Sequence, residues 1–114
     1  MKYIFFFSAI AFAADVTGDW RVQTSAAGRQ NESTCAFTQQ GADVSGTCKS
    51  ERGTVQFAGK VDGDRITWTY KSDSEGGPVT VVFKGKVASQ DKMSGSVLAV
   101  EFNVEGEFTA ARTK

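Results

Sequence analysis

The chain has 114 residues, with 13 basic and 13 acidic side chains and no histidine. A chain of this length forms one small domain, and a neutral chain without a basic run has little electrostatic drive to bind nucleic acid. The absence of histidine excludes Ser-His-Asp and Cys-His catalysis and the common histidine zinc sites. An enzyme built on this chain would have to use carboxylates, Lys, Tyr or Cys.

The first 13 residues have the pattern of a secretory signal peptide. Lys2 is followed by an apolar run over residues 3–7 and then by small residues ending in Ala11-Phe12-Ala13-Ala14. The run is too short to span a bilayer. Cleavage after Ala13 leaves 101 residues with 12 basic and 13 acidic side chains. We therefore expect a signal peptide at residues 1–13 and one secreted or periplasmic domain at residues 14–114, without a membrane span.

Beyond the signal peptide, apolar and polar residues alternate, as in Ile66-Thr67-Trp68-Thr69-Tyr70. A period of two in segments rich in Val, Thr and aromatic residues predicts β-strands, and clusters such as Asp62-Gly63-Asp64 predict the turns between them. The seventh connection, Ala99-Val100-Glu101, lacks both Gly and Pro. The predicted strands cover residues 18–25, 32–40, 43–50, 53–61, 65–71, 78–87, 92–98 and 102–112.

A short pattern, apolar-x-Gly-x-apolar, occurs six times along these strands. With a period of two, each glycine lies on the inward face beside its apolar neighbours. Glycine weakens a strand, so its repeated inward placement indicates a sheet that bends sharply or leaves internal room. The six glycines are Gly18, Gly46, Gly59, Gly85, Gly95 and Gly106.

Short connections without a crossover helix favour an antiparallel meander. Eight such strands predict an all-β fold, a closed up-and-down barrel whose interior holds packed side chains or one small ligand. The alternative is a two-sheet β-sandwich of the same strands.

The two cysteines are predicted to form a structural disulfide, which suits an oxidising compartment. If Gly41 and Ala42 form a two-residue loop, Cys35 lies directly opposite Cys48 at a non-hydrogen-bonded position, where two strands approach most closely. A redox pair is the alternative, but the chain lacks the close Cys-x-x-Cys spacing that such pairs usually have.

The Gly18-Asp19-Trp20 start of the first strand, with Arg112 at the end of the last, resembles the signature of the calycins. This superfamily includes lipocalins, fatty-acid-binding proteins, avidins and bacterial metalloprotease inhibitors. The resemblance implies that Trp20 lies across the closed end of the barrel with Arg112 packed over its ring. These two residues would then be structural, since a cation over an indole seals the barrel floor.

Candidate ligand-binding residues come from the inward aromatic positions. They could line an apolar pocket in which the Tyr70 hydroxyl orients a polar group of the ligand. The alternative is that the rings simply fill the core, with the inward glycines balancing their volume. The five residues are Phe57, Trp68, Tyr70, Phe83 and Phe108.

Other polar features have ordinary explanations. Carboxylates lie in turns or on outward positions, so no metal site is expected, and no cofactor is implied. Lys84 and Lys86 lie outward near Val82 and form a weak candidate interaction strip, although exposed strand lysines often prevent edge pairing. Asn31-Glu32-Ser33 matches a glycosylation sequon.

The sequence therefore predicts a small extracytoplasmic barrel that carries or scavenges a small apolar ligand. The alternative is a protein-binding module, such as an inhibitor of a secreted protease or other hydrolase, with a protein as its partner. Catalysis is not expected, although a cofactor-free isomerase or cyclase needs only a shaped apolar pocket and one polar group such as Tyr70.

Overall fold

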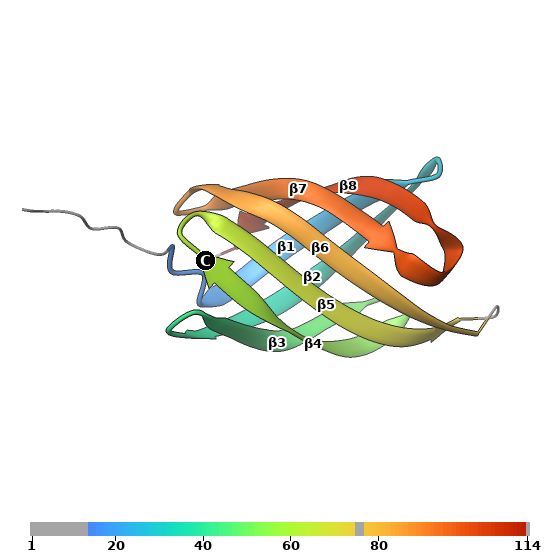
Figure 1. Ribbon diagram of the computed structural model, residues 1–114, viewed down its shortest axis with the longest axis horizontal. Coiled ribbons are helices and arrows are strands. Elements are labelled where there is room, and N and C mark those ends of the chain that lie inside the picture. The colour runs from blue at the N-terminus through green and yellow to red at the C-terminus, as the bar shows by residue number, and fades with distance from the viewer. Residues whose placement is uncertain (1–13, 75–76, 114) are drawn as a thin grey trace, which may run out of the picture.

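The computed structural model describes residues 14–74 and 77–113. The predicted signal peptide, residues 1–13, lies outside the described residues. The rest of the chain forms eight antiparallel strands closed into one barrel, in which each strand pairs with its sequence neighbours and β8 returns to β1 (Figure 1). This confirms the predicted meander barrel and excludes the two-sheet sandwich.

The strand bounds follow the predicted alternation closely. They are β1 Gly18–Ala26, β2 Arg29–Gln40, β3 Asp43–Ser50, β4 Gly53–Asp62, β5 Arg65–Ser74, β6 Gly77–Ser89, β7 Lys92–Ala99 and β8 Val104–Arg112. The side chains of alternate residues are buried, so one face of every strand lies inside the barrel. Closure leaves no strand with an unpaired edge in the described barrel, which removes the usual template for edge-to-edge association.

The last strand starts later than predicted. Residues Val100–Phe102 form a single 3-10 turn, η1, and β8 begins at Val104 rather than at residue 102. Asn103 ends the turn in a left-handed conformation with φ of 54°, which asparagine tolerates better than most residues. The sequence predicts a connection at residues 99–101 but ends it two residues too early, because the residue that ends the turn is an asparagine, not a glycine.

The inward glycines mark places where neighbouring strands and rings come close. A β-carbon at Gly46 would overlap the carbonyl oxygen of Ala36 and would lie 2.8 Å from the ring of Phe57. At Gly85 it would lie 2.7 Å from the ring of Phe108. These glycines therefore allow sharp bending of the sheet, and the space they leave next to the interior is occupied by aromatic rings.

Cys35 and Cys48 form a disulfide across β2 and β3. Gln40 pairs with Asp43, and Cys35 is the direct cross-strand partner of Cys48, as the hairpin arithmetic predicts. The bridge closes the β2–β3 hairpin from within, because both cysteines are buried.

The two ends of the barrel differ. The start of β1 and the end of β8 lie at one end of the barrel, together with the β2–β3, β4–β5 and β6–β7 turns (Figure 1). The opposite end carries the β1–β2, β3–β4 and β5–β6 connections and the turn η1. We call these the closed end and the open end, because the N-terminal segment covers only the first.

Candidate ligand-binding site

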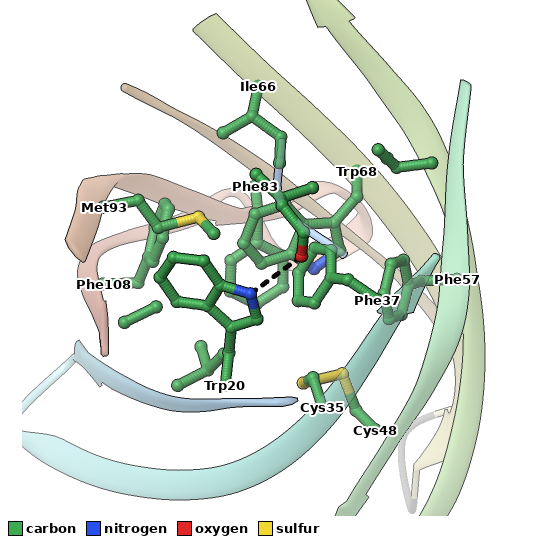
Figure 2. Close-up of a cluster of buried hydrophobic side chains, with 14 of the residues drawn as sticks. Trp20, Cys35, Phe37, Cys48, Phe57, Ile66, Trp68, Phe83, Met93 and Phe108 are labelled. Carbon is green, nitrogen blue, oxygen red and sulfur yellow. Dashed lines mark hydrogen bonds between the residues drawn. A yellow bond between two sulfur atoms is a disulfide. The ribbon is translucent and has the colours of Figure 1, made fainter. Parts of the chain in front are cut away.

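The closed end is sealed by Val16, Trp20 and Arg112. Val16 is fully buried, and its carbonyl oxygen accepts a hydrogen bond of 2.9 Å from the indole Nε1 of Trp20 (Figure 2). The Arg112 guanidinium carbon lies 4.6 Å from the centroid of the Trp20 ring. The pattern Val16-x-Gly18-x-Trp20 predicts that Val16 lies on the inward face with Trp20, but Val16 was not among the predicted barrel-closure residues.

Arg112 also ties the chain ends together. Its guanidinium donates hydrogen bonds to three backbone carbonyl oxygens, those of Asp15 at 2.9 Å, Thr17 at 2.6 Å and Gln90 at 2.9 Å. Gly18 makes room for this side chain, because a β-carbon there would lie 2.6 Å from Nη1 of Arg112. The Gly-x-Trp start and the terminal arginine are therefore parts of one structural clasp.

The middle of the barrel is filled by aromatic rings. Trp68 is at the centre of this cluster, stacked on Phe83 at 4.6 Å with an interplanar angle of 7°. Phe108 lies edge-on to the Trp68 ring at 5.2 Å, and Phe57 lies at 6.0 Å. These four predicted site residues are each no more than 4% exposed. The structure thus brings them together, packed on one another (Figure 2).

Phe37 is a fifth ring of this cluster, and it was not among the predicted site residues. It lies 4.6 Å from Phe57 and 5.1 Å edge-on from Trp68. Its position opposite Gly46 on the inward face of β2 was the signal that could have placed it there. Its ring also reaches Trp20 at 6.3 Å, so the cluster is continuous with the closed-end seal.

Trp68 carries a polar atom that the packing leaves without a partner. Its indole Nε1 is buried and makes no hydrogen bond within the described structure, although the residue is only 1% exposed. Leaving a buried donor unpaired costs on the order of 1–3 kcal/mol. The two tryptophans therefore differ: the indole N–H of Trp20 is hydrogen-bonded, whereas that of Trp68 is not.

Tyr70 occupies a different position from the other predicted site residues. It follows Trp68 on the inward face of β5, toward the open end, and it is only half-buried. Its ring centroid lies 6.0 Å from that of Phe83. Burial raises the pKa of the Tyr70 hydroxyl, and the positive charge of Arg52 partly offsets this effect. The hydroxyl therefore stays protonated at neutral pH and can donate or accept a hydrogen bond.

The open end has no counterpart of the Val16–Trp20–Arg112 seal in the described residues. Apart from Val79, which is buried, the inward side chains there are half-buried, and those around Tyr70 are small or carry a hydroxyl group. We call this set the mouth; besides Tyr70 it consists of Thr24, Ser33, Val55, Ser72, Val81 and Ala99. An apolar lining with a few hydroxyl groups is the usual composition of a small-molecule site.

The turn η1 stands at the edge of the mouth and is held in place by Glu101. The carboxylate of Glu101 accepts a hydrogen bond from the Thr80 backbone nitrogen at 2.6 Å and another from the Thr80 hydroxyl at 2.7 Å. The backbone hydrogen bond is the main reason that the pKa of Glu101 is lowered. No sequence signal pointed to this contact, because it joins residues 21 positions apart.

Two shallow hollows lie on the described surface, away from the centre of the ring cluster. One lies over β2, β3 and β4 and includes Thr38, Ser45 and Lys60. The other lies over β6, β7 and β8 and includes Lys84, Ser96 and Glu107. Within the described residues, no group of three or more His, Cys, Asp or Glu is placed to hold a metal ion. No helix of that part of the chain is long and apolar enough to cross a membrane.

Comparison with known proteins supports the fold. Neither a protein-family model nor a curated protein matches the chain. Among solved structures, a redesigned β-barrel, b11L5F_LGL, is similar with a TM-score of 0.67 and 17% identity, covering 87% of this chain and 92% of that one. The similarity in fold agrees with the topology described above, and the protein belongs to the class of small closed eight-stranded β-barrels.

Two further similar structures contain a ligand. The redesigned β-barrel mFAP1, bound to DFHBI, has a TM-score of 0.65 and 14% identity over 85% of this chain and 94% of that one. EF1p2_mFAP2b, also bound to DFHBI, has a TM-score of 0.60 and 12% identity over 87% and 94% of the two chains. Barrels of this size and topology can therefore bind one small molecule.

Proposed function

We propose that this protein is a calycin-like barrel that binds a small, largely apolar molecule at its open end, without catalysing a reaction. The proposal places it outside the cytoplasm, as a secreted or periplasmic carrier or scavenger. The disulfide and the similarity to barrels that bind DFHBI support this assignment.

The unpaired indole N–H of Trp68 is the observation that carries the proposal. A phenylalanine, although smaller, would supply a buried aromatic ring without an unsatisfied donor, so the Trp68 nitrogen is costly unless an acceptor reaches it. Trp68 lies one inward position below Tyr70, the half-buried residue of the mouth. A ligand that moves the Tyr70 ring aside would bring an acceptor toward this donor.

The ring cluster then forms the floor of the site. In this proposal Phe57, Trp68, Phe83 and Phe108 present an apolar base, while Tyr70 and the hydroxyl groups of the mouth contact the polar part of the ligand. An aromatic ligand with one hydrogen-bond acceptor fits this arrangement best, because it would take the place of the Tyr70 ring beside Phe83 and pack on the aromatic cluster below.

A matched pair of probes tests the proposal. We expect 2-acetylnaphthalene, which has a carbonyl acceptor, to shift the indole ¹H–¹⁵N NMR signal of Trp68 and to leave that of Trp20 nearly unchanged. Naphthalene, which lacks the acceptor, should bind more weakly and shift the Trp68 signal less. Native mass spectrometry of the protein from its own source should show a co-purified small molecule.

Two neighbouring substitutions provide the control. Val55→Phe fills the mouth from the inward face of β4 and should weaken binding of 2-acetylnaphthalene at least about tenfold, whereas Gln56→Phe, on the outward face, should not. If neither probe shifts the Trp68 signal and no molecule co-purifies, the proposed function is wrong.

A further inference from the structure

The outer face of β6 and β7 departs from the polar pattern of the rest of the barrel. Val82 pairs with Leu98, and both side chains point outward yet are half-buried. The turn η1 directly follows β7 and adds Val100 and Phe102, which are 46% and 49% exposed and are the large hydrophobic residues exposed in the described structure. We call these four residues the apolar strip.

The part of the strip that lies in the turn η1 is held in a fixed position by hydrogen bonds. Glu101 lies between Val100 and Phe102 in the chain, and its two hydrogen bonds to Thr80 fix the turn to β6. The two exposed side chains are therefore held outward without the loss of conformational freedom that a loose loop would suffer on binding.

Charges of opposite sign flank the strip. Lys71 on β5 and Lys84 on β6 are exposed on one side, and Glu105 and Glu107 on β8 are exposed on the other. Leu98 pairs with Glu105, and the next row toward the closed end runs from Lys84 through Ser96 to Glu107. The face thus has apolar side chains in the middle, exposed cations along one edge and exposed anions along the other. The exposed carboxylate of Glu101, hydrogen-bonded to Thr80, adds a negative charge at the turn η1.

Such a face is complementary to itself. A two-fold axis in the plane of contact, running along the strands between β6 and β7, places the cationic edge of one copy against the anionic edge of the other. Val82 then meets Leu98 of the second copy, and the two η1 turns meet near the axis. The same axis sets Lys84 of one copy over the shallow hollow of the other, which is lined by that copy's own Lys84 together with Ser96 and Glu107.

We propose that this protein forms a symmetric homodimer through the apolar strip and its two charged edges. The partner that covers the strip is a second copy of the same chain. The cationic edge of one copy meets the anionic edge of the other, so the face is self-complementary, as an isologous interface requires. The two mouths then face the same direction and remain free, so the dimer does not depend on the proposed ligand.

Sedimentation velocity of the mature, disulfide-bonded protein over a range of concentrations tests this inference. We expect a monomer–dimer equilibrium that Phe102→Ser weakens at least about tenfold, because it removes the exposed ring from the interface. Lys84→Glu and Glu107→Lys should each weaken dimerisation as well, and the double variant should restore it. Lys49→Glu on β3 makes the same charge change on another face and should have no effect.

Other results would overturn the inference. A protein that stays monomeric to near-millimolar concentration has no such interface. Dimers that persist unchanged in Phe102→Ser use a different face. A monomer that instead binds phosphatidylcholine vesicles through Phe102 would show that the strip meets a lipid surface. Circular dichroism of each variant establishes that it is folded before it is compared.

Discussion

At the scale of single residues, Arg112 makes several hydrogen bonds in addition to the contact with Trp20 that the sequence motif predicts. It packs over Trp20 and bonds to the carbonyl oxygens of Asp15, Thr17 and Gln90. The side chain is only 16% exposed, although the three residues whose carbonyl oxygens it bonds are themselves exposed. Its loss would remove these three hydrogen bonds and the contact with Trp20 together.

We therefore expect Arg112→Met to lower the free energy of unfolding by about 2–4 kcal/mol, since several charge-assisted hydrogen bonds and a cation–π contact disappear together. Chemical denaturation monitored by circular dichroism measures the change. Lys92→Met, which also removes a strand cation but from an exposed position, should change stability by less than about 0.5 kcal/mol. Equal effects of the two substitutions would contradict the clasp.

Gly46 gives a second prediction at this scale. A methyl group there overlaps the Ala36 carbonyl oxygen and crowds the Phe57 ring, so Gly46→Ala should destabilise the barrel by about 2 kcal/mol or more. Ser45→Ala, the neighbouring outward position, should be nearly neutral. A fully stable Gly46→Ala protein would show that β2 and β3 can separate without cost.

At the scale of elements, the β2–β3 hairpin is stabilised by its disulfide. The loop between Cys35 and Cys48 spans 13 positions, for which the chain-entropy model gives a stabilisation of about 3 kcal/mol. The double variant Cys35→Ala, Cys48→Ala should lose about this much, as measured by urea denaturation in the absence of reductant. Wild-type protein under reductant should approach the same stability, and no difference on reduction would contradict the prediction.

The turn η1 adds a pH-dependent contact. Because the pKa of Glu101 is lower in the folded state, its bonds to Thr80 stabilise the turn above the ordinary glutamate pKa of about 4.3 and are lost as pH falls through the lower folded value. NMR titration of the Glu101 carboxyl carbon should give a midpoint below that value. In Glu101→Gln, the Thr80 amide should exchange faster at neutral pH, and unchanged exchange would contradict this role.

How far these elements could be predicted depends on how local their signals are. The strands and the Cys35–Cys48 register follow from alternation and from one two-residue turn, both visible within a short segment. The bond between Glu101 and Thr80 does not, because it joins two outward positions that only the closed barrel brings together. Val16 is an intermediate case: the pattern Val16-x-Gly18-x-Trp20 predicts an inward position, but not the hydrogen bond between its carbonyl oxygen and the Trp20 indole.

The candidate site was predicted only in part for a related physical reason. Period-two alternation identifies an inward face but not the depth of a side chain along the barrel axis. Phe57, Trp68, Phe83 and Phe108 are therefore indistinguishable from Tyr70 in sequence, although four are buried in the centre and Tyr70 is at the mouth. Depth is set by strand tilt and register, which are properties of the closed sheet.

At the scale of the whole molecule, the adjacent chain ends permit a change of connectivity. β1 pairs with β8, and the Thr113 backbone nitrogen donates a hydrogen bond of 2.9 Å to the Asp19 carbonyl oxygen. A circular permutant that joins the ends by a short flexible linker and opens the β3–β4 turn at residues 51–52 should keep the fold, because that turn is exposed.

The permutant should retain the wild-type circular dichroism spectrum and form the same disulfide. Opening the chain at residues 57–58, within β4, provides the contrasting control, since it interrupts a strand with a buried ring. That variant should fail to fold. A folded product from the second cut, or an unfolded one from the first, would contradict the description of the barrel as a ring of hairpins.

The two buried indole N–H groups can also serve as intrinsic NMR probes of local opening of the barrel. Trp20 is protected from solvent hydrogen exchange by a hydrogen bond at the closed end, whereas Trp68 is protected by burial alone. Exchange at Trp20 therefore measures release of the Val16 seal, and exchange at Trp68 measures breathing of the ring cluster. Following both signals in one spectrum distinguishes opening of the barrel floor from opening of its centre, without any added label.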